Sequence, residues 1–344
     1  MICEQSIKTI PYSGQTSCLR HSHPTLSFNA STSKLLQTLS LLIASLCFIS
    51  STALAAERYT SQDLPQCRDK TLQQQLESLI DSQGLRRAAK QGRLSASLVD
   101  ITDLASPRYA SVNGTQMMYA ASLPKIALLL GAYETSERRH QPIDSLRYDA
   151  LIDMIRHSSN TAATEIYNWI GPARLASILT SRRYRLYDLN RNGGLWVGKP
   201  YSKSRTWQRD PLHNTSHGAN AEQVARFYYL LETGQLVSAR ASREMKDILS
   251  EPSINHKFVK GLEQRPGSII YRKSGSWRSW HSDSAIIERG GRRYIAVVLA
   301  NDSKGGEWIS DLIVGFDDLI YSSPQLAIGS AFQEALNDGT STIQ

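Results

Sequence analysis

Cysteine is scarce in this sequence, and most of it lies near the amino terminus. The 344 residues contain four cysteines, and three of them, Cys3, Cys18 and Cys47, precede residue 56. If this first segment is removed, only Cys67 is left and no internal disulfide can form. Stability must then come from packing of apolar side chains, which make up 41% of the residues. The small disulfide-stapled class of secreted protein is excluded.

Clustered charge is also lacking. Lysine and arginine number 39 against 31 acidic residues, a net charge of +8, and the basic residues stand in short groups such as Arg182-Arg183 and Arg292-Arg293. Nucleic-acid binding requires a denser basic stripe, so we predict no nucleic-acid partner. A solvated basic surface is the simplest interpretation. Contact with an anionic surface, such as a cell wall or membrane headgroups, is the alternative.

Long hydrophobic runs are absent except at residues 35–49, and that run is interrupted by polar residues. It is too short and too polar to span a membrane comfortably. Lys34 precedes it and Ala53-Leu54-Ala55 follows, which is the pattern of a secretory signal peptide. We therefore predict that residues 1–55 are a signal peptide with a long N-terminal extension. The chain 56–344 is expected to be exported, periplasmic or secreted, with a retained membrane anchor as the alternative.

Metal ligands do not form a recognisable set. His213 and His217 are four residues apart, but no nearby carboxylate or cysteine pattern completes a site. A polar loop is the better interpretation of this segment, and we predict neither a metal nor a cofactor.

The spacing of apolar residues predicts a single domain over residues 56–344. We expect helices at 70–82, 120–133, 145–157, 161–170, 221–231 and 307–321, and strands at 94–101, 108–112, 268–273, 282–288 and 294–301. Residues 186–219 have weak periodicity and are expected to be a long functional loop. This order predicts an α/β (α+β) fold with a five-stranded antiparallel sheet flanked by the terminal helices. An all-α subdomain is expected over residues 120–250.

A hydroxyl and an amine stand three residues apart in Ser122-Leu123-Pro124-Lys125. On a helix they share one face, and a buried helix entrance would lower the pKa of Lys125 so that it can accept the proton of Ser122. The motif alone is weak, because Ser31-Thr32-Ser33-Lys34 also matches it. An N-cap serine followed by a solvated lysine is the structural alternative.

Two further motifs follow in sequence. Ser158-Ser159-Asn160 precedes a predicted helix, where N-capping is the alternative explanation. Lys273-Ser274-Gly275 ends a predicted strand, where the lysine and the hydroxyl would hold a substrate carboxylate and the glycine would let the substrate backbone lie alongside. A solvated lysine on an edge strand is the alternative there. The order of the three motifs, each in a suitable context, favours catalysis over coincidence.

With these three motifs the chain resembles the penicillin-recognising serine enzymes, the class A β-lactamases in particular, over most of residues 70–320. Ser158-Ser159-Asn160-Thr161-Ala162-Ala163 is similar to their Ser-Asp-Asn-Thr-Ala-Ala. The resemblance implies that Ser122 is the nucleophile, Lys125 the base and Ser158 the proton relay to the leaving nitrogen. Asn160 would contact a substrate amide, and Lys273 and Ser274 would hold the carboxylate. The backbone N–H groups of Ser122 and Ser276 would form the oxyanion hole.

Two features depart from the class A pattern. Class A enzymes deacylate with a glutamate in the loop after the second motif, yet no glutamate occurs between Glu165 and Glu222. Ser122 and Ser158 also stand closer in sequence than is usual for that class. Asp188 and Asp210 are the carboxylates of the interval. We expect an apolar setting to raise the pKa of Asp188 toward that of a base, and an ion pair with Arg209 to lower that of Asp210; Lys125 serving both steps is the alternative to Asp188.

The sequence thus predicts a serine hydrolase, expected to be a monomer, that forms an acyl-enzyme with a small-molecule β-lactam. A D-alanyl-D-alanine peptidase acting on peptidoglycan stem peptides is the first alternative. A sensor that is acylated without turnover and a scaffold with decayed motifs are the others.

Overall fold

The computed structural model describes residues 62–203 and 205–322. The predicted signal peptide, with Cys3, Cys18 and Cys47, lies outside these residues, so export stays a prediction. Among the residues described, no helix combines the length and the apolar character that crossing a membrane would need.

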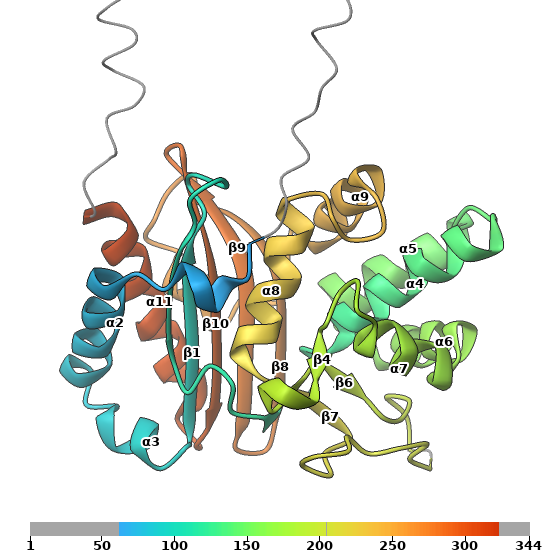
Figure 1. Ribbon diagram of the computed structural model, residues 1–344, viewed down its shortest axis with the longest axis horizontal. Coiled ribbons are helices and arrows are strands. Elements are labelled where there is room, and N and C mark those ends of the chain that lie inside the picture. The colour runs from blue at the N-terminus through green and yellow to red at the C-terminus, as the bar shows by residue number, and fades with distance from the viewer. Residues whose placement is uncertain (1–61, 204, 323–344) are drawn as a thin grey trace, which may run out of the picture. The chain divides into compact units, whose positions relative to one another are not determined.

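A five-stranded antiparallel sheet forms the centre of the described part (Figure 1). Its strands are β1 (Leu94–Asp100), β2 (Arg108–Val112), β8 (Ile269–Trp277), β9 (Trp280–Arg289) and β10 (Arg292–Asn301), in the order β2-β1-β10-β9-β8. The predicted sheet is confirmed. One difference concerns β8, which continues to Trp277, so Lys273-Ser274-Gly275 lies within the strand instead of ending it.

The central strand β10 shows why the sheet is covered on both faces. Ile295, Val297 and Leu299 belong to one apolar cluster, whereas the intervening residues Ala296 and Val298 belong to another. Successive side chains of a strand point to opposite faces, so each face of β10 contributes to a separate core. A strand buried on both faces needs a helical layer on each side.

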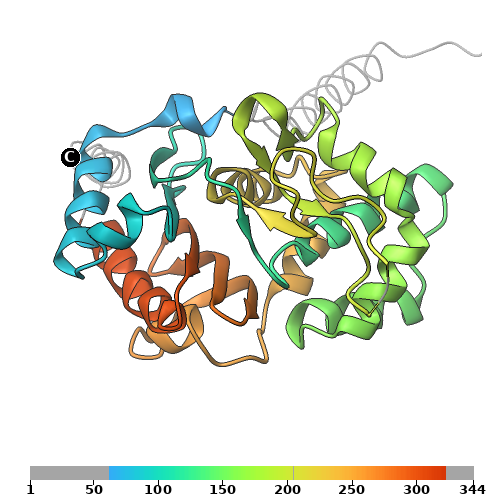
Figure 2. The same cartoon turned by 90° about the horizontal axis from the view of Figure 1, so that it is seen from below.

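Helices supply both layers (Figures 1 and 2). The terminal helices α2 (Lys70–Ser82) and α11 (Gly305–Ser322) pack on one face, together with the short α3 (Arg86–Lys90) and α10 (Phe258–Gly261). On the other face lies α8 (Ala221–Glu232), which contacts β1, β9 and β10. The predicted placement of the terminal helices beside the sheet is confirmed.

The remaining helices lie on the side of α8. They are α4 (Lys125–Arg139), α5 (Ser145–Arg156), α6 (Asn160–Ile170), α7 (Pro172–Thr180) and α9 (Ala239–Leu249). The helix predicted from residue 120 begins only at Lys125, because Ala121 has a φ of 50° that no α-helix accommodates. Residues 120–124 instead form turns, in which N–H groups bond to carbonyls three residues earlier.

The long segment 186–219 contains little regular structure, as predicted, but it is anchored by short strands. β4 (Tyr187–Asp188) pairs with β5 (Gly193–Gly194), and a 3₁₀ turn, η2 (Leu189–Arg191), lies between them. β6 (Trp196–Val197) and β7 (His217–Ala219) form a second sheet with β3 (Met118–Tyr119). Because β3 directly precedes the turn that carries Ser122, this pairing ties the long segment to that turn. A further 3₁₀ turn, η1 (Leu64–Cys67), precedes α2.

Candidate active site

Ser122 lies in the turn that leads into α4 and is half-buried. Its carbonyl accepts a hydrogen bond from the backbone N–H of Lys125 at 3.2 Å, so the two residues are joined by one turn of the chain. Pro124, not Ser122, is the N-cap of α4, and no side chain caps this helix. The capping explanation for Ser122 is therefore not the one the structure adopts.

The amine of Lys125 is enclosed by groups from two other segments. Nζ donates to the carbonyl of Ser158 at 2.7 Å and to Oδ1 of Asn160 at 2.9 Å, and it lies 3.4 Å from Oγ of Ser158. It also lies 4.6 Å from the ring centroid of Tyr201. The side chain is fully buried, and this burial lowers the pKa of Lys125 to about 7.

Ser158 and Asn160 can both contact the amine of Lys125 because the residue between them, Ser159, caps the N-terminus of α6. Ser159 is the N-cap, and its hydroxyl accepts from the N–H of Ala162 at 3.2 Å. Ser158 has a φ of 58°, a left-handed conformation that costs a non-glycine residue free energy and often marks a functional site. The motif thus combines one capping serine with two residues free to contact the amine of Lys125.

Lys273 extends this polar group from the sheet. Its Nζ donates to Oγ of Ser158 at 3.0 Å and to the carbonyl of Ser274 at 2.9 Å. Although β8 is an edge strand, Lys273 is buried, unlike the solvated lysines that protect sheet edges. Burial, and next the charge of Lys125, hold the pKa of Lys273 well below its usual value.

Gly275 allows β8 to touch the turn of Ser122. A Cβ atom at this position would lie 2.3 Å from the carbonyl oxygen of Ala120 and 2.7 Å from the backbone nitrogen of Ser122. Any side chain here would push the strand and the turn apart. The backbone of Ser276, the next residue along β8, is thereby brought beside that of Ser122.

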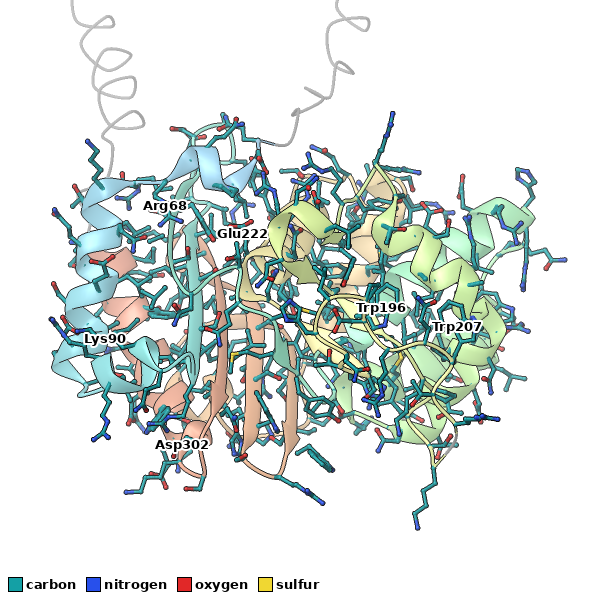
Figure 3. The ribbon with its side chains drawn as sticks, turned by 60° about the horizontal axis from the view of Figure 1, so that its bottom comes forward. Arg68, Lys90, Trp196, Trp207, Glu222 and Asp302 are labelled. Atoms are coloured by element: carbon teal, nitrogen blue, oxygen red, sulfur yellow. The ribbon has the colours of Figure 1, made fainter. Side chains whose placement is uncertain are left out.

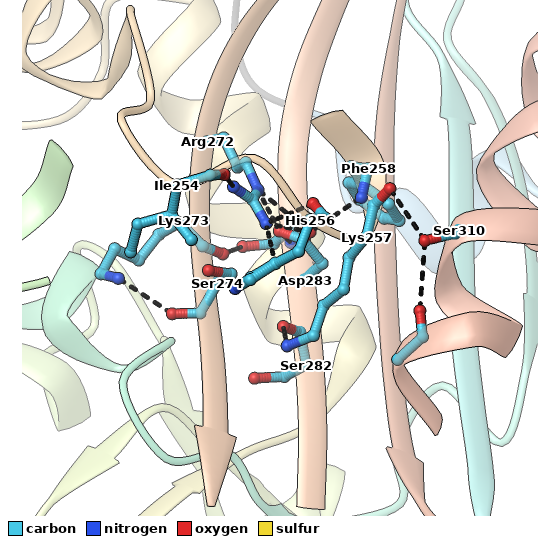
Figure 4. A network of polar contacts seen from close by, with 12 residues as sticks. Ile254, His256, Lys257, Phe258, Arg272, Lys273, Ser274, Ser282, Asp283 and Ser310 are labelled. Atoms are coloured by element: carbon cyan, nitrogen blue, oxygen red, sulfur yellow. Dashed lines mark hydrogen bonds and ion pairs between the residues drawn. The ribbon is translucent and has the colours of Figure 1, made fainter. Parts of the chain in front are cut away.

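A third buried lysine, Lys257, contacts the same stretch of β8 and also Ser282 of β9, beside which Figure 4 shows it. Lys257 Nζ donates to the Gly275 carbonyl at 2.6 Å, to Ser276 Oγ at 2.8 Å and to the Ser282 carbonyl at 3.0 Å. Burial lowers its pKa to about 8. Nearby, the buried pair of Arg272 and Asp283 fixes the segment that carries Lys257, because Arg272 also donates to the Ile254 carbonyl at 2.7 Å.

The half-buried Ser122 opens onto a pocket of about 200 Å³. Its lining comes from the turn of Ser122, α6, β8 and the long segment 186–219: Tyr119, Ala121, Ser122, Asn160, Lys199, Tyr201, Ser202, His217, Ser276 and Trp277. No carboxylate is among these described lining residues. The wall of the pocket therefore contains a lysine and several aromatic rings. Two of its residues, Asn160 and Tyr201, contact the buried amine of Lys125.

Comparisons with known proteins identify the family of this chain. The model of the Beta-lactamase enzyme family matches residues 141–321, which is more than half of the chain. The protein belongs to this family. The match includes Ser158, Asn160 and Lys273–Ser276 but begins after Ser122 and Lys125, which are placed by the structure.

Solved structures of this family share the fold at low sequence identity. A beta-lactamase from Sphaerobacter thermophilus has 15% identity and a TM-score of 0.56, with 71% of this chain and 95% of that one covered. PBP-A has 19% identity and a TM-score of 0.54, with 78% and 97% covered. TLA-3 extended-spectrum beta-lactamase has 12% identity and a TM-score of 0.56, with 72% and 98% covered. No curated protein sequence matches.

Asp188 lies away from the pocket of this β-lactamase family member. It borders a separate cavity that Arg185 and Trp196 also line. Burial of Asp188 alone would raise its pKa, but hydrogen bonds from Arg185 and from the N–H of Asn190 outweigh burial and lower it. The predicted rise in the pKa of Asp188 is therefore wrong, because Arg185, three residues earlier in the chain, pairs with its carboxylate.

Asp210 has a structural role, but not through the predicted partner. It is buried and accepts hydrogen bonds from the Tyr187 hydroxyl at 2.8 Å and from the N–H of Thr215 at 3.0 Å. Burial opposes a lower pKa, yet these hydrogen bonds produce one. Arg209 donates to the Asn214 carbonyl, so the lowering does not come from the expected ion pair.

Sequence reasoning missed three residues that shape the site: Tyr201, His217 and Lys257. His217 was assigned to a polar loop, but it is a buried residue of β7, and burial lowers its pKa to about 4. Its Nε2 lies 3.1 Å from the Lys199 carbonyl, whereas the ring of His213 contacts Asn192. No motif marks these residues, because their neighbours come from distant segments.

We predict that Gly275→Ala lowers the free energy of unfolding by about 1–3 kcal/mol, the usual cost of overpacking, because the new methyl group meets three backbone atoms. Urea unfolding of both proteins measures the change. Gly306→Ala is the control, since its Cβ would approach no atom closer than 3.6 Å. Equal stability of the Gly275→Ala and wild-type proteins would contradict the close approach.

Proposed function

We propose that this protein is a serine acyl hydrolase in which β-lactams acylate Ser122, and that it releases the acyl group slowly. The observation that carries the proposal is the environment of Lys125. A buried amine with a pKa of about 7 is a base at neutral pH, and it lies one turn of chain from a half-buried hydroxyl that borders a pocket.

The hydrogen bonds of Lys125 favour its role as base. A neutral amine has two N–H donors and one lone pair, and two close acceptors are present in the Ser158 carbonyl and Oδ1 of Asn160. With both donors used, the lone pair is left to accept a proton. On this proposal the free lone pair accepts the proton of Ser122, which lies one turn of the chain away.

Acylation then involves three proton transfers. Ser122 Oγ bonds to the lactam carbonyl carbon as its proton passes to Lys125, and the carbon–nitrogen bond of the lactam breaks as Ser158 donates its proton to the leaving nitrogen. Lys125 returns the proton to Ser158, whose Oγ lies 3.4 Å from Nζ. The N–H groups of Ser122 and Ser276 would stabilise the oxyanion, while Lys273 and Ser274 would hold the carboxylate.

Release of the acyl group requires an activated water. No carboxylate lines the pocket among the described residues, so Lys125 is the base that we assign to this step. PBP-A, which has a similar fold, supports acylation by a penicillin: a variant of that protein with leucine replaced by glutamate forms an acyl-enzyme complex with penicillin G.

The absence of a carboxylate near Ser122 also favours a second candidate function. A D-alanyl-D-alanine peptidase of peptidoglycan stems uses the same acylation steps without a dedicated deacylating glutamate. In either case we propose action outside the cytoplasm, in the periplasm or the medium, on a small-molecule β-lactam or a stem peptide. A monomeric state and the lack of a nucleic-acid partner stay predictions.

Incubation with a penicillin should add the mass of one intact penicillin to the protein, and Ser122→Ala should abolish the adduct. Intact mass spectrometry measures it. Ser202→Ala, which removes another hydroxyl that borders the pocket, is the control and should keep the adduct. A persistent adduct in Ser122→Ala would place the nucleophile elsewhere.

The acylation rate should rise with pH and reach half of its maximum near pH 7, because Lys125 accepts a proton only when neutral and its pKa is about 7. Tyr201→Ala should expose the amine to water and move the midpoint upward by about one pH unit or more. Tyr201→Phe keeps the ring and should keep the midpoint. Stopped-flow acylation across pH 5–10 checks this, and an unmoved midpoint in Tyr201→Ala would reject shielding by the ring.

Asp188→Asn should leave the first-order rate of acyl release within about twofold of the wild type, because Asp188 borders a different cavity. Hydrolysis of a chromogenic cephalosporin after the acylation burst gives this rate. Slower release with an unchanged burst would restore Asp188 as the deacylating base.

Faster release of D-alanine from a D-alanyl-D-alanine peptide than of hydrolysed β-lactam would favour the second candidate function.

A further inference from the structure

Aromatic rings form a continuous group along one side of the pocket. Tyr119 lies at its centre, with ring-centroid distances of 5.5 Å to Trp277, 6.2 Å to Trp280 and 6.3 Å to His217. The ring of Tyr201 lies 4.2 Å from that of His217. All of these except Trp280 line the pocket.

Within this group, Trp277 combines exposure with a fixed position. It is 48% exposed, an unusual state for the largest apolar side chain. The guanidinium of Arg278 lies 4.3 Å from its ring centroid, and Tyr119 approaches it at a tilted angle of 59°. A ring that is held by two neighbours loses little freedom when a ligand covers it.

The direction of a bound acyl donor follows from the roles assigned along β8. Lys273 and Ser274 would hold the carboxylate, which belongs to the leaving side of the donor, and the N–H of Ser276 would contact the carbonyl oxygen. Each strand residue advances the chain by about 3.3 Å. The group on the acyl side of the carbonyl therefore continues toward the next residue, Trp277.

We propose that Tyr119 and Trp277 form a subsite for an aromatic group on the acyl side of the donor. This inference rests on the proposed function, because it places the donor through the acylation of Ser122. An aromatic group on the donor would cover the exposed ring of Trp277 and meet Tyr119 at an angle that ring quadrupoles favour. Donors with a small aliphatic acyl group would leave these rings in water.

The experiment compares two penicillins that differ only in this group: benzylpenicillin, and the analogue with methyl in place of benzyl. Second-order acylation rate constants are measured by intact mass for the wild type, Trp277→Ala, Trp277→Phe and Trp207→Ala. Trp207 is the matched control because it is 43% exposed but does not line the pocket. It lies with Trp196 beside the helices drawn in green, away from the sheet (Figure 3).

We expect the wild type to prefer benzylpenicillin about tenfold, and Trp277→Ala to lose most of this preference with less than about a twofold change for the methyl analogue. Trp277→Phe should keep part of the preference, and Trp207→Ala should match the wild type. Equal losses for both donors in Trp277→Ala, or no preference in the wild type, would overturn the subsite. Failure of the proposed function would look different, since neither donor would then form an adduct at Ser122.

Discussion

The contact between β8 and the turn that precedes α4 is the constraint on which the site depends. The turn carries Ser122 and Lys125, whereas β8 carries Lys273, Ser274 and Ser276, and these segments are about 150 residues apart in sequence. They meet because Gly275 has no side chain to separate its backbone from Ala120 and Ser122. Ser282 strengthens this contact from β9 by donating to the Ala120 carbonyl at 2.9 Å. Because β8 is held this close to the turn of Ser122, a backbone N–H group of β8 and one of the turn can point toward the same atom of a bound ligand.

Three buried lysines lie close to this contact, and the free-energy cost of burying their charges explains why their pKa values are lowered. Lys125, Lys257 and Lys273 are all buried, and Asp283, the buried carboxylate whose charge acts on Lys257 and Lys273, is already paired with Arg272. Burial of uncompensated ammonium groups favours their neutral forms, which supplies a base in Lys125. The same deficit of negative charge favours a ligand that brings its own carboxylate. The proposed catalysis by the amine and the proposed preference for an anionic donor would thus share one electrostatic origin.

The sequence allowed prediction of the fold and of the motif positions, because both depend on local patterns. The continuous apolar run in residues 294–301 reflects a strand that is buried on both faces, and the four-residue steps in residues 70–82 reflect a helix with one buried face; the sheet and terminal helices agree with the predictions. The surroundings of single residues were not predictable in this way. Asp188 follows two apolar residues, but Arg185, which precedes them, pairs with its carboxylate, and the apolar residues alone did not predict this pair. Tyr201 reaches Lys125 only after the segment 186–219 folds back through the pairing of β7 with β3. A tyrosine in a loop of weak periodicity carries no signal of such a contact.

The position of Tyr201 links the missing glutamate to the proposed slow release. In the class A enzymes that this chain resembles, the corresponding long loop supplies the base for deacylation. Here the loop instead places an aromatic ring 4.6 Å from the amine of Lys125, with its hydroxyl 3.3 Å from the Ala121 carbonyl. A ring in this position contributes to the burial that lowers the pKa of Lys125, and on the proposed mechanism this would assist acylation. Because hydrolysis of the acyl-enzyme needs water near the same amine, a shield that assists the first step slows the second.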